Sequence, residues 1–501
     1  MTIQFQCRQD KTIPKLGWIA IADTAENRLN ILHGEFVEHG SDWLVEGVWD
    51  GRFQDGVFNR SDFFFGSGVR KESDKIFFVP SIAQTDRILL CRDKDDIVVS
   101  NSLLLLLGYT GASLDNNHDY QDESTSIALK GFKNYKKGFR IIHPTIKQFY
   151  QVYHENVVLE KGEITFEPKT RDMVFFESYQ DYYQSLVEKL KEIQVNYSSR
   201  YRRWPIKAYT TISSGYDSTA ASCLAKEVGV KECFTGRPLD GLVFRRPAES
   251  STRIGRKLGF RVHHLDSKRK NISKDELYFL AGNYPKHSKS VWSEISLHSM
   301  VKKIQQRKSP AAVFMGYCGD DVWGNKGSID PETGDLLHTP PISGSNLSEI
   351  RLHTGFVTLS PAYMFLRNIS QIKKLSLSKE MDPWRLNNDY DRPIPRRIAE
   401  EAGIPRKWFG IKKRHITTTY YWPINKGNRQ AFFRHLRKNM RMGRWHVAVY
   451  YLKKRFIIKM LGKTPLSMKD IDFYDMIRKW ATEVLKNKYS MIFIKQGHLQ
   501  K

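Results

Sequence analysis

The chain has 501 residues, 40% of them hydrophobic, and carries 80 lysine and arginine residues against 54 acidic residues, which gives a net charge of +26. This composition excludes an intrinsically disordered chain, and the length predicts two or three domains. Five scattered cysteines without a C-x-x-C pair predict neither a disulfide scaffold nor a zinc site, and they indicate a reducing compartment. The N-terminal segment lacks the apolar core of a signal peptide, and the longest apolar run, 103–107, is too short to span a bilayer, so we expect a soluble cytoplasmic protein.

Residues 1–175 are predicted to form a mainly β domain. Short runs of alternating apolar and polar residues are separated by Gly, Asn and Asp, a pattern typical of antiparallel strands joined by turns. The stretch 111–126 is polar and acidic, and we expect it to be a loop. Further strand-like segments follow it and complete the domain near residue 175.

In residues 177–420 the spacing of apolar residues changes, and helical spacing appears beside the short β-rich runs. Their first segment places five apolar or aromatic residues on one face at helical spacing: Tyr183, Leu186, Val187, Leu190 and Ile193. Short β-rich runs then alternate with helical runs of about ten residues, and this order favours a parallel sheet with crossover helices. The β-rich runs are 206–213, 231–236, 260–266 and 311–315, and the helical runs are 218–229, 248–259 and 301–310.

The first chemical motif lies between a predicted strand and a predicted helix. Small residues allow a tight turn whose N–H groups, at a positive helix N-terminus, can hold phosphate oxygens. Hydroxyls add donors, and Asp217 offers a carboxylate for Mg²⁺. Taken alone, the motif is more commonly a Ser/Gly turn that caps a helix. Its members are Ser213, Ser214, Gly215, Tyr216, Asp217 and Ser218.

The second motif, 316–324, directly follows the predicted strand 311–315. It carries Asp320 and Asp321 at the carboxyl end of that strand, which is the edge of a parallel sheet where ligands bind. Either carboxylate alone could belong to a plain turn. Together with Asp217 they form a candidate Mg²⁺ site for a nucleotide, because Mg²⁺ prefers one or two carboxylates plus phosphate oxygens.

These motifs together resemble the asparagine synthetase-like ATP pyrophosphatases. Residues 213–218 are similar to the family's S-G-G-x-D-S pyrophosphate loop, and 316–324 are similar to its G-x-G-x-D-E-x-F-G segment. The segment 392–414 resembles its late lysine-bearing element, and 86–107 is similar to strands and a leucine-rich helix of its glutaminase domain. The resemblance covers about 180–415 most fully.

The resemblance implies a Rossmann-like ATP-pyrophosphatase domain over 177–420, preceded by a degenerate glutaminase-like domain of Ntn type over 1–175. The implied reaction is ATP-dependent amide formation, in which a carboxylate attacks the α-phosphorus of ATP to give an acyl-adenylate and pyrophosphate. Ammonia or an amine then displaces AMP. The carboxylate substrate is a small molecule or a peptide side chain, and the cofactors are ATP and Mg²⁺.

The resemblance also assigns individual residues. Asp217 and Asp320 become metal ligands, and Lys412 becomes the cation that stabilises the transition state, with Lys413 as the alternative register. Tyr317 stands where asparagine synthetases have glutamate and β-lactam synthetases have tyrosine, so it is assigned to catalysis. The family's glutaminase nucleophile is a cysteine directly after the initiator methionine. This chain has Thr2 there, so we expect no glutamine hydrolysis.

Residues 421–501 are predicted to form a basic helical C-terminal region. From 411 to 469 the chain holds sixteen Lys or Arg residues and no acidic residue, with aromatic residues interleaved. This pattern fits an anionic membrane surface, RNA, or a solvated face over an aromatic core. Two alternative functions therefore remain besides amide formation: an RNA-modifying ATP pyrophosphatase and a non-catalytic binding protein. Four arginines recur at helical spacing there: Arg434, Arg437, Arg441 and Arg444.

Overall fold

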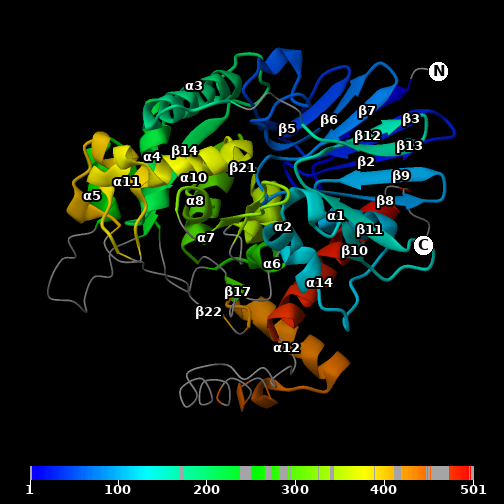
Figure 1. The fold of residues 1–501 in the computed structure, drawn as a ribbon. Coiled ribbons are helices and arrows are strands. Elements are labelled where there is room, and N and C mark those ends of the chain that lie inside the picture. Colours follow the sequence, from blue (N-terminus) through cyan, green and yellow to red (C-terminus); the bar gives the residue numbers. More distant parts are fainter. Residues whose placement is uncertain are drawn as a thin grey trace.

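The computed structural model has a mixed α/β architecture in which a mainly β N-terminal region lies beside a region built on a parallel sheet (Figure 1). Every helix among the described residues is too short or too polar to cross a lipid bilayer. The described residues are 3–169, 174–236, 250–265, 272–282, 291–292, 295–324, 327–338, 344–388, 390–410, 419–420, 422–446, 448–449, 452, 473–495 and 497.

Two sheets form the N-terminal region. The first has the order β1 (Gln4–Gln9), β3 (Arg28–His33), β2 (Trp18–Asp23), β9 (Asp96–Ser100), β8 (Ile88–Asp93), β11 (Gln148–Val152) and β10 (Gly138–Arg140). The second has the order β13 (Glu163–Glu167), β12 (Asn156–Glu160), β7 (Lys75–Val79), β6 (Phe65–Glu72), β5 (Trp43–Val48) and β4 (Glu38–His39). The predicted antiparallel pairing is confirmed throughout except between β1 and β3, which run parallel.

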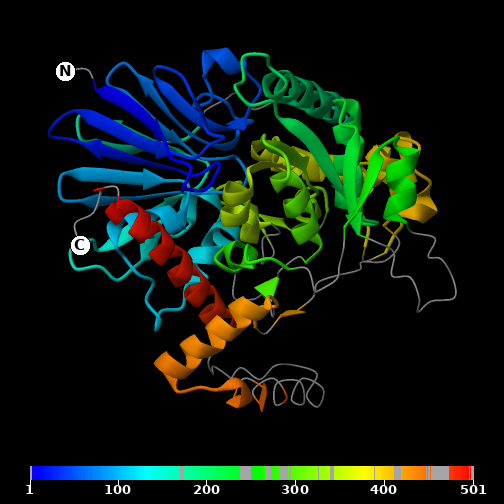
Figure 2. The ribbon, with the colours of Figure 1, turned by 180° about the vertical axis from the view of Figure 1, so that it is seen from behind.

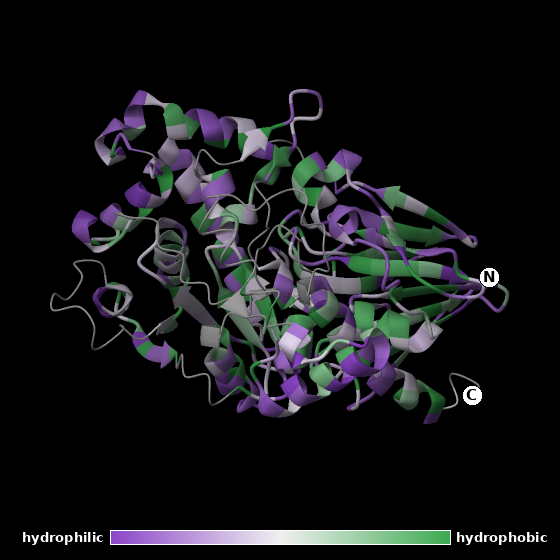
Figure 3. Cartoon of the chain, turned by 90° about the horizontal axis from the view of Figure 1, so that it is seen from below, coloured by the Kyte–Doolittle hydropathy of each residue, from purple (hydrophilic) through white to green (hydrophobic). Residues whose placement is uncertain are grey.

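The first sheet contributes side chains to two hydrophobic cores, one on each of its faces, because successive residues of a strand point to opposite sides. In β2, Trp18 and Ala20 pack between the two sheets, whereas Ile19 and Ile21 face the opposite side. Helix α1 (Leu103–Thr110) covers that opposite side, and all five of its leucines are buried. Successive side chains of a strand point to opposite faces, so a strand buried on both faces becomes apolar throughout. Figure 3 shows this hydrophobic colouring along the N-terminal strands.

The loop expected at 111–126 is wrong over 121–126, because helix α2 (Gln121–Asn134) begins at Gln121. Several polar residues of its first turns are buried rather than solvated. The Glu123 carboxylate lies 2.8 Å from Nε2 of His118 and 3.1 Å from Nζ of Lys136, and the Thr125 hydroxyl donates to the Gln121 carbonyl. Polarity did not indicate exposure here.

The second region is a parallel five-stranded sheet in the order β16 (Arg261–Leu265), β15 (Glu232–Gly236), β14 (Lys207–Ile212), β18 (Ala311–Phe314) and β21 (Phe356–Leu359). All four strands predicted in this part of the chain are confirmed. The strand order runs outward in one direction from β14 to β16 and in the other direction from β18 to β21. The sheet therefore reverses between β14 and β18, and a reversal of this kind is the switch point at which doubly wound sheets bind ligands.

Helices cover both faces of this sheet. Tyr209 and Val313 join the core that contains α6 (Glu276–Leu280) and α7 (Ile295–Gln305). Ile212 and Phe314 point to the other face and join a separate core. That second core is built with α3 (Tyr179–Tyr197), α4 (Tyr216–Glu227), α5 (Ser251–Lys257), α10 (Ile369–Leu377) and α11 (Pro393–Glu401). The predicted apolar face of α3 is confirmed, with Leu186, Val187, Leu190 and Ile193 buried.

The C-terminal helices reach back to the N-terminal region. Helix α14 (Phe473–Lys495), red in Figure 2, runs along α1. A Cβ on Gly108 would lie 2.8 Å from Cβ of Tyr489, so the two helices meet where one has no side chain. Helix α12 (Lys426–Met440) packs on α14, with the rings of Phe432 and Trp480 5.3 Å apart.

A buried ionic cluster joins the two regions. Arg351 in α9 (Ser348–Thr354) donates two hydrogen bonds to the Glu46 carboxylate, at 2.9 and 3.0 Å, and one to Asp86 at 2.6 Å. Burial works against the charged form, but Asp86 and Glu46 raise the pKa of Arg351 above its ordinary value. Beside it, the buried Glu349 carboxylate accepts from the Ser102 hydroxyl and the Leu103 N–H, and thereby caps α1 from the other region.

Replacing Arg351 by methionine should lower the free energy of unfolding by about 3–5 kcal/mol, because it leaves the Glu46 and Asp86 carboxylates buried without their counter-charge. The matched control is Arg60→Met, whose exposed contact with Glu72 should be worth about 0–1 kcal/mol. Denaturant unfolding monitored by circular dichroism measures both variants. Equal effects of the two substitutions would show that the junction is not held by this cluster.

Candidate functional site

The two predicted motifs lie side by side at the switch point of the parallel sheet. Residues 213–215 follow β14 and lead into α4, and 315–318 follow β18 and lead into the short helix α8 (Gly319–Val322). Because β14 and β18 are neighbours and run parallel, both loops emerge at the same edge. The structure thus brings together two segments that are about a hundred residues apart in the sequence.

The first loop is folded by its own hydroxyls. The Ser213 N–H donates to Oγ of Ser218 at 3.0 Å, the two serine hydroxyls lie 2.5 Å apart, and the Gly215 N–H donates to Oγ of Ser213 at 3.1 Å. Gly215 is the N-cap of α4 and has no side chain with which to satisfy the first turn. Backbone N–H groups and hydroxyl donors therefore gather at the positive end of a twelve-residue helix, an arrangement suited to an anion.

Tyr216 contributes to this loop through its backbone rather than its side chain. Its ring is fully buried, 4.9 Å from that of Tyr390, and its hydroxyl accepts a hydrogen bond from Arg396. Burial raises the pKa of Tyr216, with Arg396 acting in the opposite direction. The side chain thus anchors the start of α4 to the core, and only the backbone of Tyr216 faces the candidate site.

The second loop lies directly against the first. A Cβ on Gly316 would collide with the carbonyl carbon of Asp217 and the nitrogen of Ser218, and one on Gly319 would lie 2.6 Å from Cβ of Asp217. Two glycines in the second loop are therefore required for this contact. Their close approach places α8, which carries Asp320, over the first turn of α4.

Asp217 and Asp320 converge on a single arginine. Nη1 of Arg392 lies 2.5 Å from Oδ2 of Asp217, and Nη2 lies 3.7 Å from Oδ2 of Asp320. The Arg392 side chain is almost fully buried; burial opposes its charge, but the two carboxylates raise the pKa of Arg392. The pair predicted to bind Mg²⁺ is thus brought together around a cationic centre, and its donor set of two carboxylates fits that ion.

The late element contacts the same loop. The Gly410 N–H donates to the Ser214 carbonyl at 2.9 Å, and Arg396 from α11 donates to the Tyr216 hydroxyl. Lys412 and Lys413 lie outside the described residues. Gly410, the last described residue before these lysines, is thus bonded to the turn of residues 213–218.

Tyr317 lies in the second loop, and it contacts Ser360 and Gly344. Its carbonyl accepts a hydrogen bond from the Ser360 hydroxyl at 2.7 Å, and its half-buried ring packs against Gly344, where a Cβ would lie 2.6 Å from the ring. The tyrosine is thereby fixed next to the carboxylates of α8.

The position of the family's glutaminase nucleophile, Thr2, lies outside the described residues. Cys7 is in β1, where burial raises the pKa of its thiol to about 12.

The predicted arginine stripe is confirmed only for part of its length. Arg434 and Arg437 lie on α12 and are exposed, while Phe433 and Leu436 are buried beside them. The helix ends at Met440, because Arg441 adopts a left-handed conformation, so Arg441 and Arg444 lie beyond it, also exposed. Trp445 is 74% exposed next to them. Most of the remaining 411–469 segment lies outside the described residues.

Sequence reasoning missed Arg392, the residue that links the two carboxylates. It lies 175 positions from Asp217, and nothing in its local sequence marks it except its place at the start of the segment that resembles the family's late element.

No protein-family model matches the chain, and a search of curated proteins finds no match.

Substituting Gly316 by alanine should destabilise the protein by about 1–3 kcal/mol, the usual range for forcing an extra carbon into a packed contact. Gly236→Ala is the matched control: Gly236 lies at the carboxyl end of β15, where an added Cβ would have no atom of the described residues within 4 Å. Denaturant midpoints of the two variants give the comparison. If Gly316→Ala is as stable as the control, the two loops do not depend on this contact.

Arg392→Gln should raise the affinity for Mg²⁺ in the absence of nucleotide by at least about tenfold, or about 1.4 kcal/mol. Removing the guanidinium takes away the cation that competes for the oxygens of Asp217 and Asp320. Isothermal titration calorimetry with MgCl₂ measures the change. The control is Arg385→Gln, which removes a surface contact to Asp382. Unchanged or weaker Mg²⁺ binding in Arg392→Gln would contradict the shared site.

Proposed function

We propose that this chain is an asparagine synthetase-like, AMP-forming carbon–nitrogen ligase. It activates a carboxylic acid with ATP and transfers the acyl group to ammonia or an amine, without hydrolysing glutamine. The observation that carries the proposal is the convergence of Asp217 and Asp320, from neighbouring strand ends, beside a hydroxyl-rich turn at a helix N-terminus.

The phosphate-binding turn supplies the first requirement. In the free protein the N–H groups of Ser213 and Gly215 are bonded to hydroxyls of the same turn, so the donors are already gathered and need only exchange partners when an anion arrives. Preorganised donors stabilise developing charge without reorganisation, and this is the largest contribution in much of enzyme catalysis. Pyrophosphate, as the leaving group, is the anion that this turn would hold.

The carboxylate pair supplies the second requirement. Asp217 and Asp320 would hold Mg²⁺ together with phosphate oxygens, and the ion would offset the charge of the triphosphate. Arg392 is positioned to take part, since its guanidinium already lies between the two carboxylates. Once displaced from them, it could donate two parallel hydrogen bonds to a phosphate.

The acceptor half of the reaction involves Tyr317 and Lys412. Tyr317 lies in the same loop as Asp320, and Lys412 follows the segment whose Gly410 is bonded to the phosphate-binding turn. A flexible lysine ammonium beside that turn could meet the charge that appears as the acyl-adenylate forms and collapses. This role of Lys412 rests on the resemblance and on the position of Gly410.

One observation favours a second candidate, an RNA-modifying ATP pyrophosphatase. Arg434, Arg437, Arg441 and Arg444 are all exposed, and the nearby Trp445 offers an exposed aromatic face, which is a combination that binds phosphates and stacks on bases. The same surface would suit an anionic membrane. The N-terminal β region, which an RNA-modifying enzyme would not need, favours the ligase.

The decisive experiment measures ATP–pyrophosphate exchange over a panel of carboxylic acids, with and without ammonia, glutamine and amines, and in parallel with total RNA. Exchange that requires a carboxylic acid supports the ligase. Exchange that requires RNA and disappears with rising salt supports the second candidate. No exchange with any member of either panel counts against both.

Asp217→Asn and Asp320→Asn should each weaken Mg·ATP binding by at least about tenfold, or about 1.4 kcal/mol, because each removes one charged metal ligand. Both variants should stay folded, as neither carboxylate belongs to a hydrophobic core. The control is Asp382→Asn at the surface. Calorimetric titration with Mg·ATP gives the affinities, and unchanged affinity in both variants would show that these are turn residues.

A further inference from the structure

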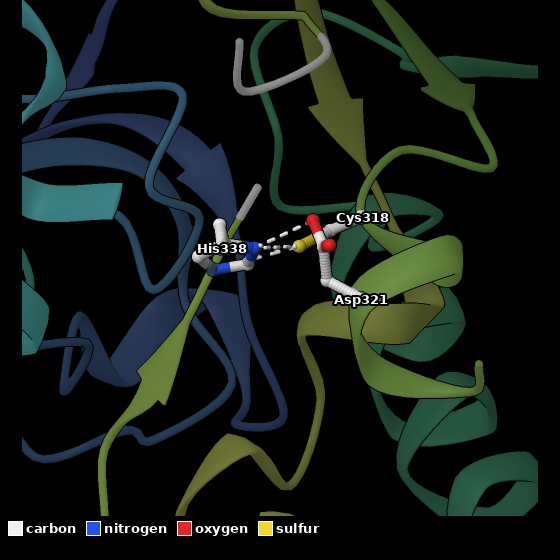
Figure 4. Close-up of side chains that lie close together, drawn as sticks. All are labelled: Cys318, Asp321 and His338. Carbon is white, nitrogen blue, oxygen red and sulfur yellow. Dashed lines mark hydrogen bonds and ion pairs between the residues drawn. The ribbon is translucent and has the colours of Figure 1, made fainter. Parts of the chain in front are cut away.

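Three potential metal ligands converge beside the Asp217–Asp320 pair, and one of them is Asp321, which the sequence grouped with that pair but which contacts His338 instead. Cys318 is the N-cap of α8, Asp321 lies within α8, and His338 directly follows β20 (Leu336–Leu337) (Figure 4). Sγ of Cys318 lies 3.0 Å from Nδ1 of His338, and Oδ2 of Asp321 lies 2.9 Å from the same nitrogen. A thiol, a carboxylate and an imidazole thus point at one another, with their ligand atoms all within 4.8 Å.

The cluster is closed to solvent. Cys318 is 3% exposed, Asp321 6% and His338 4%. A buried carboxylate is costly unless its charge is compensated, and a buried imidazole is costly unless its nitrogens have polar partners. Low exposure also argues against a catalytic cysteine–histidine pair, because a nucleophilic thiol must be reached by its substrate.

One imidazole nitrogen faces both of the other groups. Both Sγ of Cys318 and Oδ2 of Asp321 approach Nδ1 of His338, and a ring nitrogen carries at most one proton. Nδ1 can therefore donate to Sγ or to Oδ2 but not to both, and Cys318 has a further side-chain hydrogen bond to Tyr363. A cation among the three atoms would contact the sulfur, the carboxylate oxygen and the ring nitrogen at the same time.

The backbone conformation of Cys318 also supports a specific role for its sulfur. Its φ of 65° is in the left-handed region, where an L-residue with a Cβ is strained and glycine is preferred. The chain places a cysteine there, and the left-handed turn directs its sulfur toward His338. The strain is therefore accompanied by a contact that glycine could not make.

We propose that Cys318, Asp321 and His338 bind a Zn²⁺ ion. Thiolate, carboxylate and neutral imidazole are the three ligand types that Zn²⁺ accepts, whereas Mg²⁺ takes oxygen ligands. A thiolate and a carboxylate together carry two negative charges, which balance the two positive charges of the ion. Lys373, whose Nζ donates to the Asp321 carbonyl, is an additional positive charge beside this ligand set. The site differs from the Asp217–Asp320 pair both in its residues and in its metal preference.

The proposed ion would fix the second loop in place. The hairpin of β19 (Ser328–Ile329) and β20 is itself held by α2, since the His338 N–H donates to the Ala128 carbonyl at 2.7 Å and Asp335 accepts from the Lys133 N–H at 3.1 Å. Zinc would tie α8 to this hairpin and hence to the N-terminal region. Its role would be to position the loop that holds Tyr317 and Asp320.

The test uses the full-length chain, stripped with a chelator and then titrated with Co²⁺, whose bond to a thiolate gives a charge-transfer absorption in the near ultraviolet. We expect one equivalent of Co²⁺ to produce this band and Zn²⁺ to abolish it. Cys318→Ser should lose the band, and His338→Gln and Asp321→Asn should each weaken binding by at least about tenfold. Cys7→Ser, which removes a half-buried thiol in β1, should keep the band.

The wild-type chain alone can overturn the proposal, whatever the folding of the variants. If it shows no thiolate band at a severalfold excess of Co²⁺ and no stoichiometric zinc before stripping, Cys318, Asp321 and His338 are a hydrogen-bonded cluster only. A band that persists in Cys318→Ser would also refute it, because the sulfur ligand would then lie elsewhere. Neither readout depends on the proposed amide-forming activity, so the two proposals fail independently.

Discussion

The contact between the backbone of Gly316 and the first turn of α4 is the constraint on which the candidate site depends. It sets the separation of the two loops at a distance that no side chain could occupy. Because this contact fixes α8 over α4, Asp320 reaches the guanidinium that already binds Asp217. Parallel neighbouring strands bring the loops to one edge, and Gly316 together with Gly319 allows them to touch. The fold topology determines where the loops meet, and the absence of a Cβ at these two positions determines how closely they approach.

A second constraint holds the N-terminal region against the parallel sheet. Arg351, Glu46 and Asp86 are buried together at the junction, and Glu349 caps α1 across it. Buried ion pairs add little net stability compared with apolar packing, but they tolerate only one arrangement, because a displaced charge is left unpaired. The junction therefore specifies how the two regions sit together. Helix α14 reinforces the same arrangement by covering the leucines of α1.

The sequence predicted the elements well where periodicity was strong. The four strands and the helices α4 and α5 between 206 and 315, the apolar face of α3 and the β-rich N-terminal region follow from local patterns. The helix expected at 301–310 lies at Ile295–Gln305, and α6 was not predicted. The prediction failed where polar residues are buried. The stretch 111–126 was expected to be a loop because it is polar, yet Glu123 and Thr125 lie buried at the start of α2 with hydrogen-bond partners. The prediction also missed partners that are distant in the chain. Arg392 and His338 have no local signal, since each matters only through what the fold places beside it, and the absence of C-x-x-C pairs argued against the zinc site that we propose at Cys318.

The position of Arg392 has an energetic consequence for ligand binding. Two carboxylates as close as Asp217 and Asp320 repel each other, and in the free protein the guanidinium offsets that repulsion. A metal ion bound to the same oxygens must displace the arginine, so the observed affinity is the intrinsic affinity reduced by the strength of those contacts. A triphosphate changes the balance, because it offers the displaced guanidinium new acceptors. Metal ion and nucleotide should therefore bind more tightly together than either does alone, a coupling that arises from one arginine with two alternative sets of partners.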